Sequence, residues 1–289
     1  MDGLGQFASD ADAFINEHWR KTPTIFHPSS APVDLLSVED AWDILKGGLL
    51  RVPYIRLLGS AGPIPEERYC VPRIVSGEPL YGYADETAVR ELLRAEQATL
   101  LLRYVDQWHA GVRALTSSVA ERTGRLTEAF FFHTQPGVQS PAHRDDGDAL
   151  VIQIDGQKRW KIYGAPTDPQ WVPGRKVDTP GPVLLDTIVK PGDVLYIPHG
   201  FAHHAEAAGD ASSSHLTVTM REAAAPHLRA TLQSLLTDGC SLPGRPLGDE
   251  ALIDTARRLL DHMKMRLADT TPQQVIEHAR PHAHANRLW

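Results

Sequence analysis

The chain has 289 residues, of which 42% are hydrophobic and 22% charged, and its net charge is −7. This composition is typical of a globular protein with one large domain, or one domain and a small appendage. The acidic balance argues against a general nucleic-acid binder, which would need a basic surface. The sequence has no apolar run long enough to span a bilayer, no signal-peptide pattern at its start and only two cysteines, so we expect a cytoplasmic protein without disulfides or membrane attachment.

The first part of the chain alternates between helical and strand-like patterns. Helices are predicted at residues 10–21, 37–46, 86–95 and 107–122. Asp10 and Ser37 are the expected caps of the first two helices, and Asp40 completes a capping box with Ser37. Strands are predicted at residues 52–58, 69–74 and 99–104.

From residue 129 onward the pattern changes to short apolar runs separated by glycine and proline. Strands are predicted at 129–134, 149–154, 159–163, 183–189, 193–197, 203–207 and 215–220. Such even spacing is typical of a β-sandwich or barrel. Asp155-Gly156 and Pro191-Gly192-Asp193 have the sequence of tight hairpin turns. We therefore predict a mainly β fold with flanking helices, a double-stranded β-helix of the jelly-roll type.

The end of the chain is helical again. Amphipathic patterns predict helices at residues 227–236 and 251–267, with a glycine-containing break between them. We expect residues 1–225 to form one cupin-like domain with its N-terminal helices, and residues 226–289 to form a small C-terminal helical region. A region of this size packs on the barrel or on a second copy of the chain, and its amphipathic helices favour a homodimer.

One motif in the β-rich part carries metal-binding chemistry. His143-Arg-Asp145 is followed by Pro198-His-Gly200-Phe-Ala-His203. Two imidazoles and one carboxylate form the facial triad of non-haem Fe(II) oxygenases, which leaves coordination positions open. Residues two apart on a strand share a face, so His143 and Asp145 would point the same way. Pro198 and Gly200 are expected to turn the chain after a strand and present His203.

Neighbouring residues offer alternatives to this set. His204 could replace His203, but the Pro-x-Gly-x-x-His spacing favours His203. Asp146 and Asp148 could also reach the metal, and we favour solvated loop positions for both.

Several motifs together resemble those of the JmjC-type 2-oxoglutarate oxygenases, and most of all the cupin-like ribosomal oxygenases. In chain order these motifs are Trp19-Arg-Lys-Thr-Pro23, His143-x-Asp145, Asp155-Gly-Gln-Lys158-Arg-Trp160, Pro191-Gly-Asp-x-Leu-Tyr-x-Pro198 and Pro198-x-Gly200-x-x-His203. The resemblance covers residues 15–222. The winged-helix domain that usually follows in this branch is expected to be missing.

The resemblance implies Fe(II) held by His143, Asp145 and His203, with 2-oxoglutarate and O2 as co-substrates. It also implies that Lys158 binds the far carboxylate of 2-oxoglutarate, with Thr134 and His215 beside it. Without the triad, Lys158 would be read as a solvated lysine.

The strand before the triad departs from the family pattern. Some members have an Asn and a Tyr there, where this chain has Phe130-Phe-Phe132. Either a phenol donor is lost and Thr134 becomes more important, or the wall is more apolar and changes the substrate preference.

The function that follows from the resemblance is hydroxylation of a protein or peptide residue, with decarboxylation of 2-oxoglutarate to succinate. His or Arg is the favoured target, either in a ribosomal protein or in a ribosomally made peptide natural product. A non-catalytic metal-binding cupin and a small-molecule oxygenase are the alternatives.

Overall fold

The structure, a computed structural model, describes residues 3–8 and 10–283. The chain divides into two units. The larger unit contains residues up to 123 and residues 127–220, and the smaller unit contains residues 124–126 and those from 221 onward. Each unit is described by itself.

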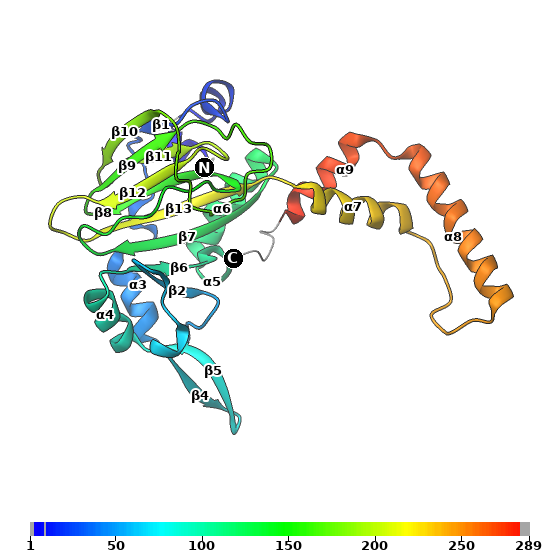
Figure 1. The fold of residues 1–289 in the computed structure, drawn as a ribbon, viewed down its shortest axis with the longest axis horizontal. Coiled ribbons are helices and arrows are strands. Elements are labelled where there is room, and N and C mark those ends of the chain that lie inside the picture. Colours follow the sequence, from blue (N-terminus) through cyan, green and yellow to red (C-terminus); the bar gives the residue numbers. More distant parts are fainter. Residues whose placement is uncertain (1–2, 9, 284–289) are drawn as a thin grey trace. The chain divides into compact units, whose positions relative to one another are not determined.

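The larger unit is built from two sheets that together form a jelly roll, with a separate hairpin (Figure 1). The eight-stranded sheet has the order β1-β11-β8-β13-β7-β6-β2-β3. Its strands are β1 (Thr24–Phe26), β2 (Ile55–Gly59), β3 (Gly62–Pro63), β6 (Thr99–Leu102), β7 (Leu126–Thr134), β8 (Gly147–Asp155), β11 (Val194–Ile197) and β13 (Ser213–Arg221). The three-stranded sheet has the order β10-β9-β12, with β9 (Lys158–Tyr163), β10 (Val183–Val189) and β12 (His203–Ala207). The hairpin pairs β4 (Cys70–Val75) with β5 (Glu78–Ala84). The predicted fold class is confirmed.

Six α-helices of the larger unit precede β7 in the sequence. They are α1 (Gly5–Ala8), α2 (Ala11–Ala13), α3 (Val38–Lys46), α4 (Glu86–Ala95), α5 (Val105–Trp108) and α6 (Ala110–Thr123). Three short helices accompany them, η1 (Phe14–His18), η2 (Val33–Leu35) and η3 (Glu66–Arg68). The predicted caps are confirmed: Asp10 accepts the backbone N–H groups of Asp12 and Ala13, and Ser37 forms a capping box with Asp40.

The predicted helix at 107–122 is wrong in one respect, because two helices replace it. His109 lies between α5 and α6 in an extended conformation. Its Nδ1 accepts the backbone N–H of Val112 at 3.2 Å. His109 therefore ends one helix and supplies a capping acceptor to the next.

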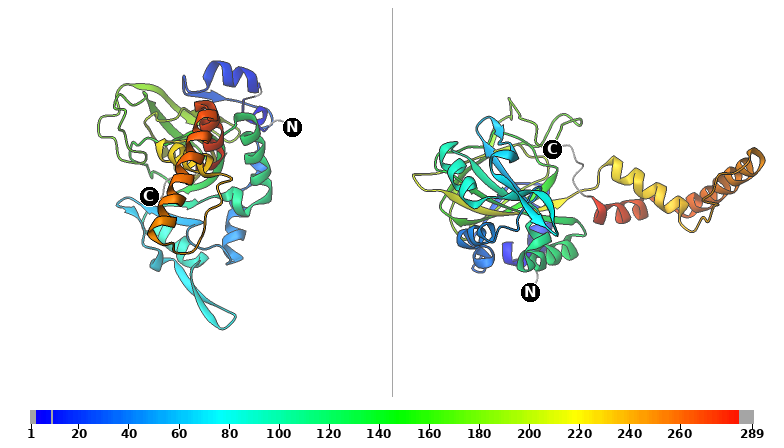
Figure 2. Two further views of the ribbon diagram at one scale, coloured as in Figure 1. Left: turned by 90° about the vertical axis from the view of Figure 1, so that its right-hand side faces the viewer. Right: turned by 90° about the horizontal axis from the view of Figure 1, so that it is seen from below.

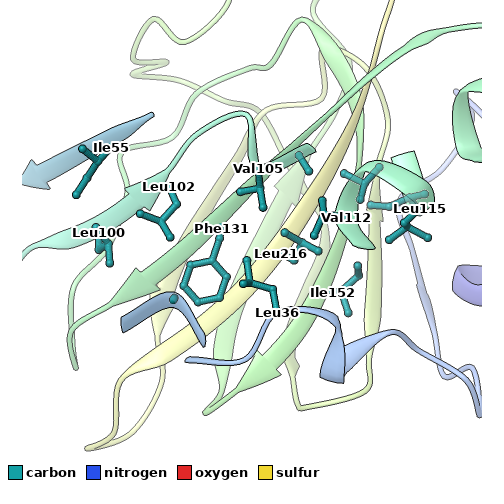
Figure 3. Packing of buried hydrophobic residues seen from close by; sticks show 14 of the residues in the cluster. Leu36, Ile55, Leu100, Leu102, Val105, Val112, Leu115, Phe131, Ile152 and Leu216 are labelled. Atoms are coloured by element: carbon teal, nitrogen blue, oxygen red, sulfur yellow. The ribbon is translucent and has the colours of Figure 1, made fainter. Parts of the chain in front are cut away.

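The main hydrophobic core lies on one face of the eight-stranded sheet, against the helices (Figure 3). Phe131 and Leu216 are fully buried there, together with Val112 of α6. Side chains alternate along a strand, so the neighbours of Phe131 on β7 face the other way, into the space between the two sheets. The candidate site is built on that inner face.

The predicted hairpin turns are tight, but they join strands of different sheets. Asp155-Gly156 connects β8 to β9, and Pro191-Gly192-Asp193 connects β10 to β11. Gly156 has φ +64°, and a Cβ there would lie 2.0 Å from the carbonyl oxygen of Ser212. The turn sequences therefore predicted the sharp bends correctly. The prediction that each bend joins two paired strands is wrong, because in a jelly roll the chain crosses from one sheet to the other at these turns.

The smaller unit contains α7 (Ala225–Thr237), α8 (Asp249–Asp269), α9 (Pro272–Ala279) and the short helix η4 (Arg280–His282) (Figure 2). Glu222 accepts hydrogen bonds from Arg125 and Arg280, each at 3.1 Å. These ion pairs tie the two ends of the unit's sequence together. Across residues 3–8 and 10–283, no helix is both long and apolar enough to cross a membrane.

Candidate metal centre

His143 and His203 are direct neighbours on two antiparallel segments. The backbone N–H of each donates to the carbonyl of the other, at N–O distances of 3.0 and 2.9 Å. Opposed residues in such a pair share a face, and the two ring centroids lie 4.4 Å apart.

His143 and Asp145 lie on an extended segment that is not part of a regular strand. His143 forms an isolated bridge to His203, Gln139 forms another to Glu206, and β8 begins only at Gly147. Pro141 lies between the two bridges and has no N–H to continue a ladder. The extended segment nevertheless directs His143 and Asp145 toward the same point.

Backbone carbonyls orient both imidazoles. The Nδ1 of His143 lies 2.8 Å from the carbonyl of Pro141, and the Nδ1 of His203 lies 3.1 Å from that of Phe201. A proton on each Nδ1 leaves the lone pair of Nε2 free for a metal. The Nε2 atoms of His143 and His203 lie 3.6 and 3.5 Å from the carboxylate oxygens of Asp145.

The donor atoms of His143, Asp145 and His203 all lie within 4.8 Å of one another, close enough to hold one metal ion. The side chain of His203 is 5% exposed, whereas that of Asp145 is 44% exposed, so the group is open on one side. Burial, followed by the neighbouring His143, lowers the pKa of His203. His203 therefore stays neutral, which is the protonation state that binds metals.

Two alternatives from the sequence do not join this group. His204 follows His203 on β12 and points to the other face, where its ring lies 6.5 Å from that of Tyr163. Asp148 is fully buried, so the expected solvated position is wrong. Its carboxylate accepts hydrogen bonds from the hydroxyl of Tyr196 at 2.7 Å, the backbone N–H of His199 at 3.1 Å and the guanidinium of Arg20 at 3.2 Å.

A buried lysine lies on the inner face of the three-stranded sheet. The Nζ of Lys158 donates to the hydroxyl of Thr134 at 2.9 Å, across the space between the two sheets. Lys158 is 5% exposed, so it is not a solvated lysine. Burial lowers the pKa of Lys158 to about 7. An anionic ligand beside this ammonium would restore the charged form.

His215 is brought to the same inner face. Its ring stacks on Phe132 with centroids 4.7 Å apart and an angle of 9° between the planes. Burial lowers the pKa of His215 well below its ordinary value, and Lys158 contributes. Within the part of the chain that the structure describes, the buried Nδ1 of His215 has no hydrogen-bond partner.

Trp160 ends one of the motifs found in the sequence, but no role was assigned to it there. Its ring lies 5.6 Å from that of His215, 5.9 Å from that of His203 and 6.0 Å from the Nζ of Lys158. Its buried Nε1–H likewise has no acceptor among the described residues. The available signal was strand alternation, because Trp160 stands two residues after Lys158. Two unpartnered polar atoms between a buried cation and the metal-binding group fit a polar ligand at this position.

Comparisons with known proteins agree with this geometry. A sequence model described as the JmjC domain matches residues 107–228. Ribosomal oxygenase 1 of Gallus gallus is 28% identical over 217 residues, which are 72% of this chain and 34% of that protein. The bifunctional lysine-specific demethylase and histidyl-hydroxylase NO66 of Drosophila persimilis is 38% identical over 112 residues, or 37% of this chain and 16% of that protein. The chain thus spans about a third or less of the length of these relatives.

The solved structures that resemble the chain include YcfD of E. coli. One YcfD structure covers 92% of this chain and 69% of its own, with a TM-score of 0.62 and 20% identity. Another, in complex with cobalt and 2-oxoglutarate, has a TM-score of 0.56 and 18% identity and covers 89% of this chain and 69% of its own. At this level of identity the likeness shows a common fold.

The JmjC match includes all three residues of the His143–Asp145–His203 group, and the buried Lys158 and the unpartnered polar atoms lie within the same match. The cofactor prediction, Fe(II) with 2-oxoglutarate, is confirmed by the JmjC domain and the His-Asp-His group together. Residues 107–228 thus carry a JmjC domain, and the domain, the relatives and the fold fit the JmjC-type oxygenase family.

Proposed function

We propose that this protein is an Fe(II)- and 2-oxoglutarate-dependent hydroxylase that modifies a residue of a ribosomal protein. The observation that carries the proposal is the convergence of His143, Asp145 and His203, with both Nε2 atoms directed at one carboxylate. Bound Fe(II) and 2-oxoglutarate would supply the oxidising chemistry, with succinate and CO2 as co-products. This chain's residues bind and orient those groups.

His143, Asp145 and His203 are the proposed metal ligands. The carbonyls of Pro141 and Phe201 hold the two imidazoles in the tautomer that leaves Nε2 free. The exposed side of Asp145 is where we propose that the target residue approaches, since His203 is covered.

Lys158, Thr134 and His215 are the proposed binding residues for 2-oxoglutarate. The ammonium of Lys158 would neutralise the far carboxylate, and its hydrogen bond to Thr134 fixes its position. Nδ1 of His215 and Nε1 of Trp160 are available for further hydrogen bonds to the co-substrate or to an ordered water. The stack of His215 on Phe132 supports the more apolar wall that the Phe130–Phe132 run suggested.

The names of the relatives support a ribosomal protein as the substrate, and one of those names includes histidyl-hydroxylase. We therefore favour histidine over arginine as the hydroxylated residue. We likewise favour a ribosomal protein over a peptide natural product as the substrate. A non-catalytic metal-binding cupin is disfavoured because Lys158 is buried without a carboxylate partner among the residues that the structure describes. Burying an unpaired charge is unfavourable, and an anionic co-substrate would supply the missing partner.

We further propose that residues 226–289 mediate self-association. No residue of the long helix α8 is buried within its own unit, as far as the described residues go. Ile253, Leu260 and Leu267 follow one another at seven-residue spacing and are 62%, 56% and 54% exposed. Such a line of apolar side chains fits the seam of a coiled coil with a second copy.

Cys70 and Cys240 are both free, which fits the reducing cytoplasm that we propose as the compartment.

The experiment that tests the enzymatic assignment is an anaerobic titration of the protein with Fe(II) and then 2-oxoglutarate. The proposal predicts a visible charge-transfer band that needs both additions, followed by succinate release and O2 uptake when air is admitted. Metal binding without a response to 2-oxoglutarate would favour the non-catalytic cupin.

A further inference from the structure

Arg144 stands between two of the proposed metal ligands but points away from both. Neighbouring residues of an extended segment face opposite sides, so His143 and Asp145 share one face and Arg144 takes the other. Arg144 is 9% exposed. A buried cation is stable only where hydrogen bonds satisfy it. Its Nη1 donates to the carbonyls of Gly164 at 2.8 Å and Gly200 at 2.6 Å.

These two carbonyls belong to segments that are far apart in the sequence. Gly200 lies in the turn that leads to His203, here called the His203 turn (residues 198–203). Gly164 begins the long connection between β9 and β10, here called the strap (residues 164–182). A single guanidinium group therefore links three segments, since Arg144 itself stands in the segment of His143 and Asp145.

The backbone around Arg144 reinforces the same junction. The N–H of Gly174 in the strap donates to the carbonyl of Arg144 at 2.7 Å, and that of Val177 donates to the carbonyl of Ala142 at 2.8 Å. On the other side, the N–H of Gly200 donates to the carbonyl of Asp145 at 3.1 Å. The strap thus runs along one edge of the ligand-bearing segment, while β12 lies along the opposite edge through the His143–His203 pair.

The strap also packs directly on the His203 turn. Gly200 has φ +76°, and a Cβ at this position would lie 3.2 Å from the ring of Trp171 and 3.3 Å from Pro166. The rings of Trp171 and His199 lie 5.6 Å apart in an edge-to-face arrangement. The close approach at Gly200 places the strap within reach of the carbonyl that Arg144 binds.

We propose that Arg144 is a positioning residue that holds the His203 turn and the strap against the segment of His143 and Asp145. The ligands come from two segments, which are joined by the His143–His203 backbone pair, the Gly200–Asp145 hydrogen bond and the Arg144 side chain. Without Arg144, the carbonyls of Gly164 and Gly200 lose a charged donor, and the attachment of the turn and the strap to the segment of His143 and Asp145 is weakened. This inference rests on the proposed function only in taking His143, Asp145 and His203 as metal ligands.

The test combines two measurements on the full chain with Arg144→Met, which keeps an apolar stem and removes the donors. The first is the rate of trypsin cleavage after Arg175 or Lys176, two exposed residues of the strap, without added metal. We expect cleavage at least about tenfold faster than in the unaltered protein. The second is the Kd for Co(II), followed by visible absorption, which we expect to rise about 10- to 100-fold, as is typical when the groups that orient metal ligands are removed.

Arg159→Met is the matched control, because Arg159 forms its bidentate ion pair with Asp186 on the exposed face of the three-stranded sheet. Arg159→Met should leave the cleavage rate and the Co(II) Kd unchanged. Arg144→Lys should bring both values closer to those of the unaltered protein than Arg144→Met does, since an ammonium can still donate to these carbonyls. If Arg144→Met does not fold, Arg144→Lys is used for the test in its place. The inference would be overturned by an Arg144 variant that has the melting temperature of the unaltered protein and an unchanged cleavage rate or an unchanged Co(II) Kd. Absence of Co(II) binding by the unaltered protein would instead contradict the proposed function itself.

Discussion

His143 and His203 exchange both of their backbone hydrogen bonds, so main-chain pairing, more than side-chain packing, sets the separation of the two imidazoles. A change of either side chain leaves this pairing intact. Substitutions of the two side chains therefore test metal binding without removing the backbone pairing.

The first prediction compares two adjacent histidines. His203→Ala should weaken Fe(II) or Co(II) binding by more than about 100-fold, because one of three ligands is lost. His204→Ala should bind the metal normally, because His204 points to the opposite face beside Tyr163. Calorimetric titration measures both, and thermal melting checks that the fold is retained. Equal losses in the two variants would show that the metal set is wrongly assigned.

The second prediction concerns the pH dependence of 2-oxoglutarate binding. Burial lowers the pKa of Lys158 to about 7 in the free protein, and a bound carboxylate raises it again. Below that pH the ammonium is already charged and the affinity is constant. Above it, binding requires uptake of a proton, so the Kd should rise by up to about tenfold per pH unit until the pKa of the complex is reached.

Titration calorimetry in two buffers of different ionisation enthalpy measures this proton uptake directly. Lys158→Met should abolish both the binding and the uptake. Lys161→Met is the control, because Lys161 stands on the other face of β9. A Kd that stays flat between pH 7 and 9 would count against Lys158 as the carboxylate partner.

The third prediction is a stability effect at Asp148. Its buried carboxylate accepts hydrogen bonds from Tyr196, His199 and Arg20. Asp148→Ala leaves these donors unsatisfied and should lower the free energy of unfolding by about 3 kcal/mol. Asp186→Ala, which removes an exposed ion pair with Arg159, should lower the free energy of unfolding far less, because solvent screens such a pair. Denaturant unfolding compares them, and equal costs would refute the structural role of Asp148.

The fourth prediction concerns self-association through α8. Replacing both Ile253 and Leu260 with Arg should convert a dimer to a monomer, because two like charges would meet along the apolar seam. Arg258→Glu, off that seam by heptad position, should leave the mass unchanged. Light scattering coupled to size-exclusion chromatography gives the mass, and a dimer in all three proteins would rule this seam out.

The short strands of the jelly roll could be predicted well because their alternation has a period of two. β10 and β12, for example, have the predicted bounds. The interruption at His109 was missed because apolar spacing continues across it, and only the folded chain shows the extended backbone of His109 and its capping hydrogen bond to Val112. The β5 strand and α9 were also missed, although Thr271 and Gln274 form a capping box that was available as a signal.

Within the site, the structure brings together the residues that motifs picked out, including Lys158 with Thr134. The residues that sequence reasoning missed or misplaced act through contacts between distant segments. Asp148 depends on Tyr196 and Arg20, and Arg144 depends on Gly164 and Gly200. No local pattern of charge or hydrophobicity marks such partners, which become visible only in the folded chain.

The most direct test of the central claim is the intact mass of every ribosomal protein in the native host, with this gene present, deleted, or replaced by the His143→Ala form. Hydroxylation predicts that one ribosomal protein loses the mass of a single oxygen atom on deletion. The unaltered gene should restore that mass, and the His143→Ala form should not. Identical masses in all strains would contradict a ribosomal protein substrate, and restoration by His143→Ala would contradict the metal-dependent mechanism.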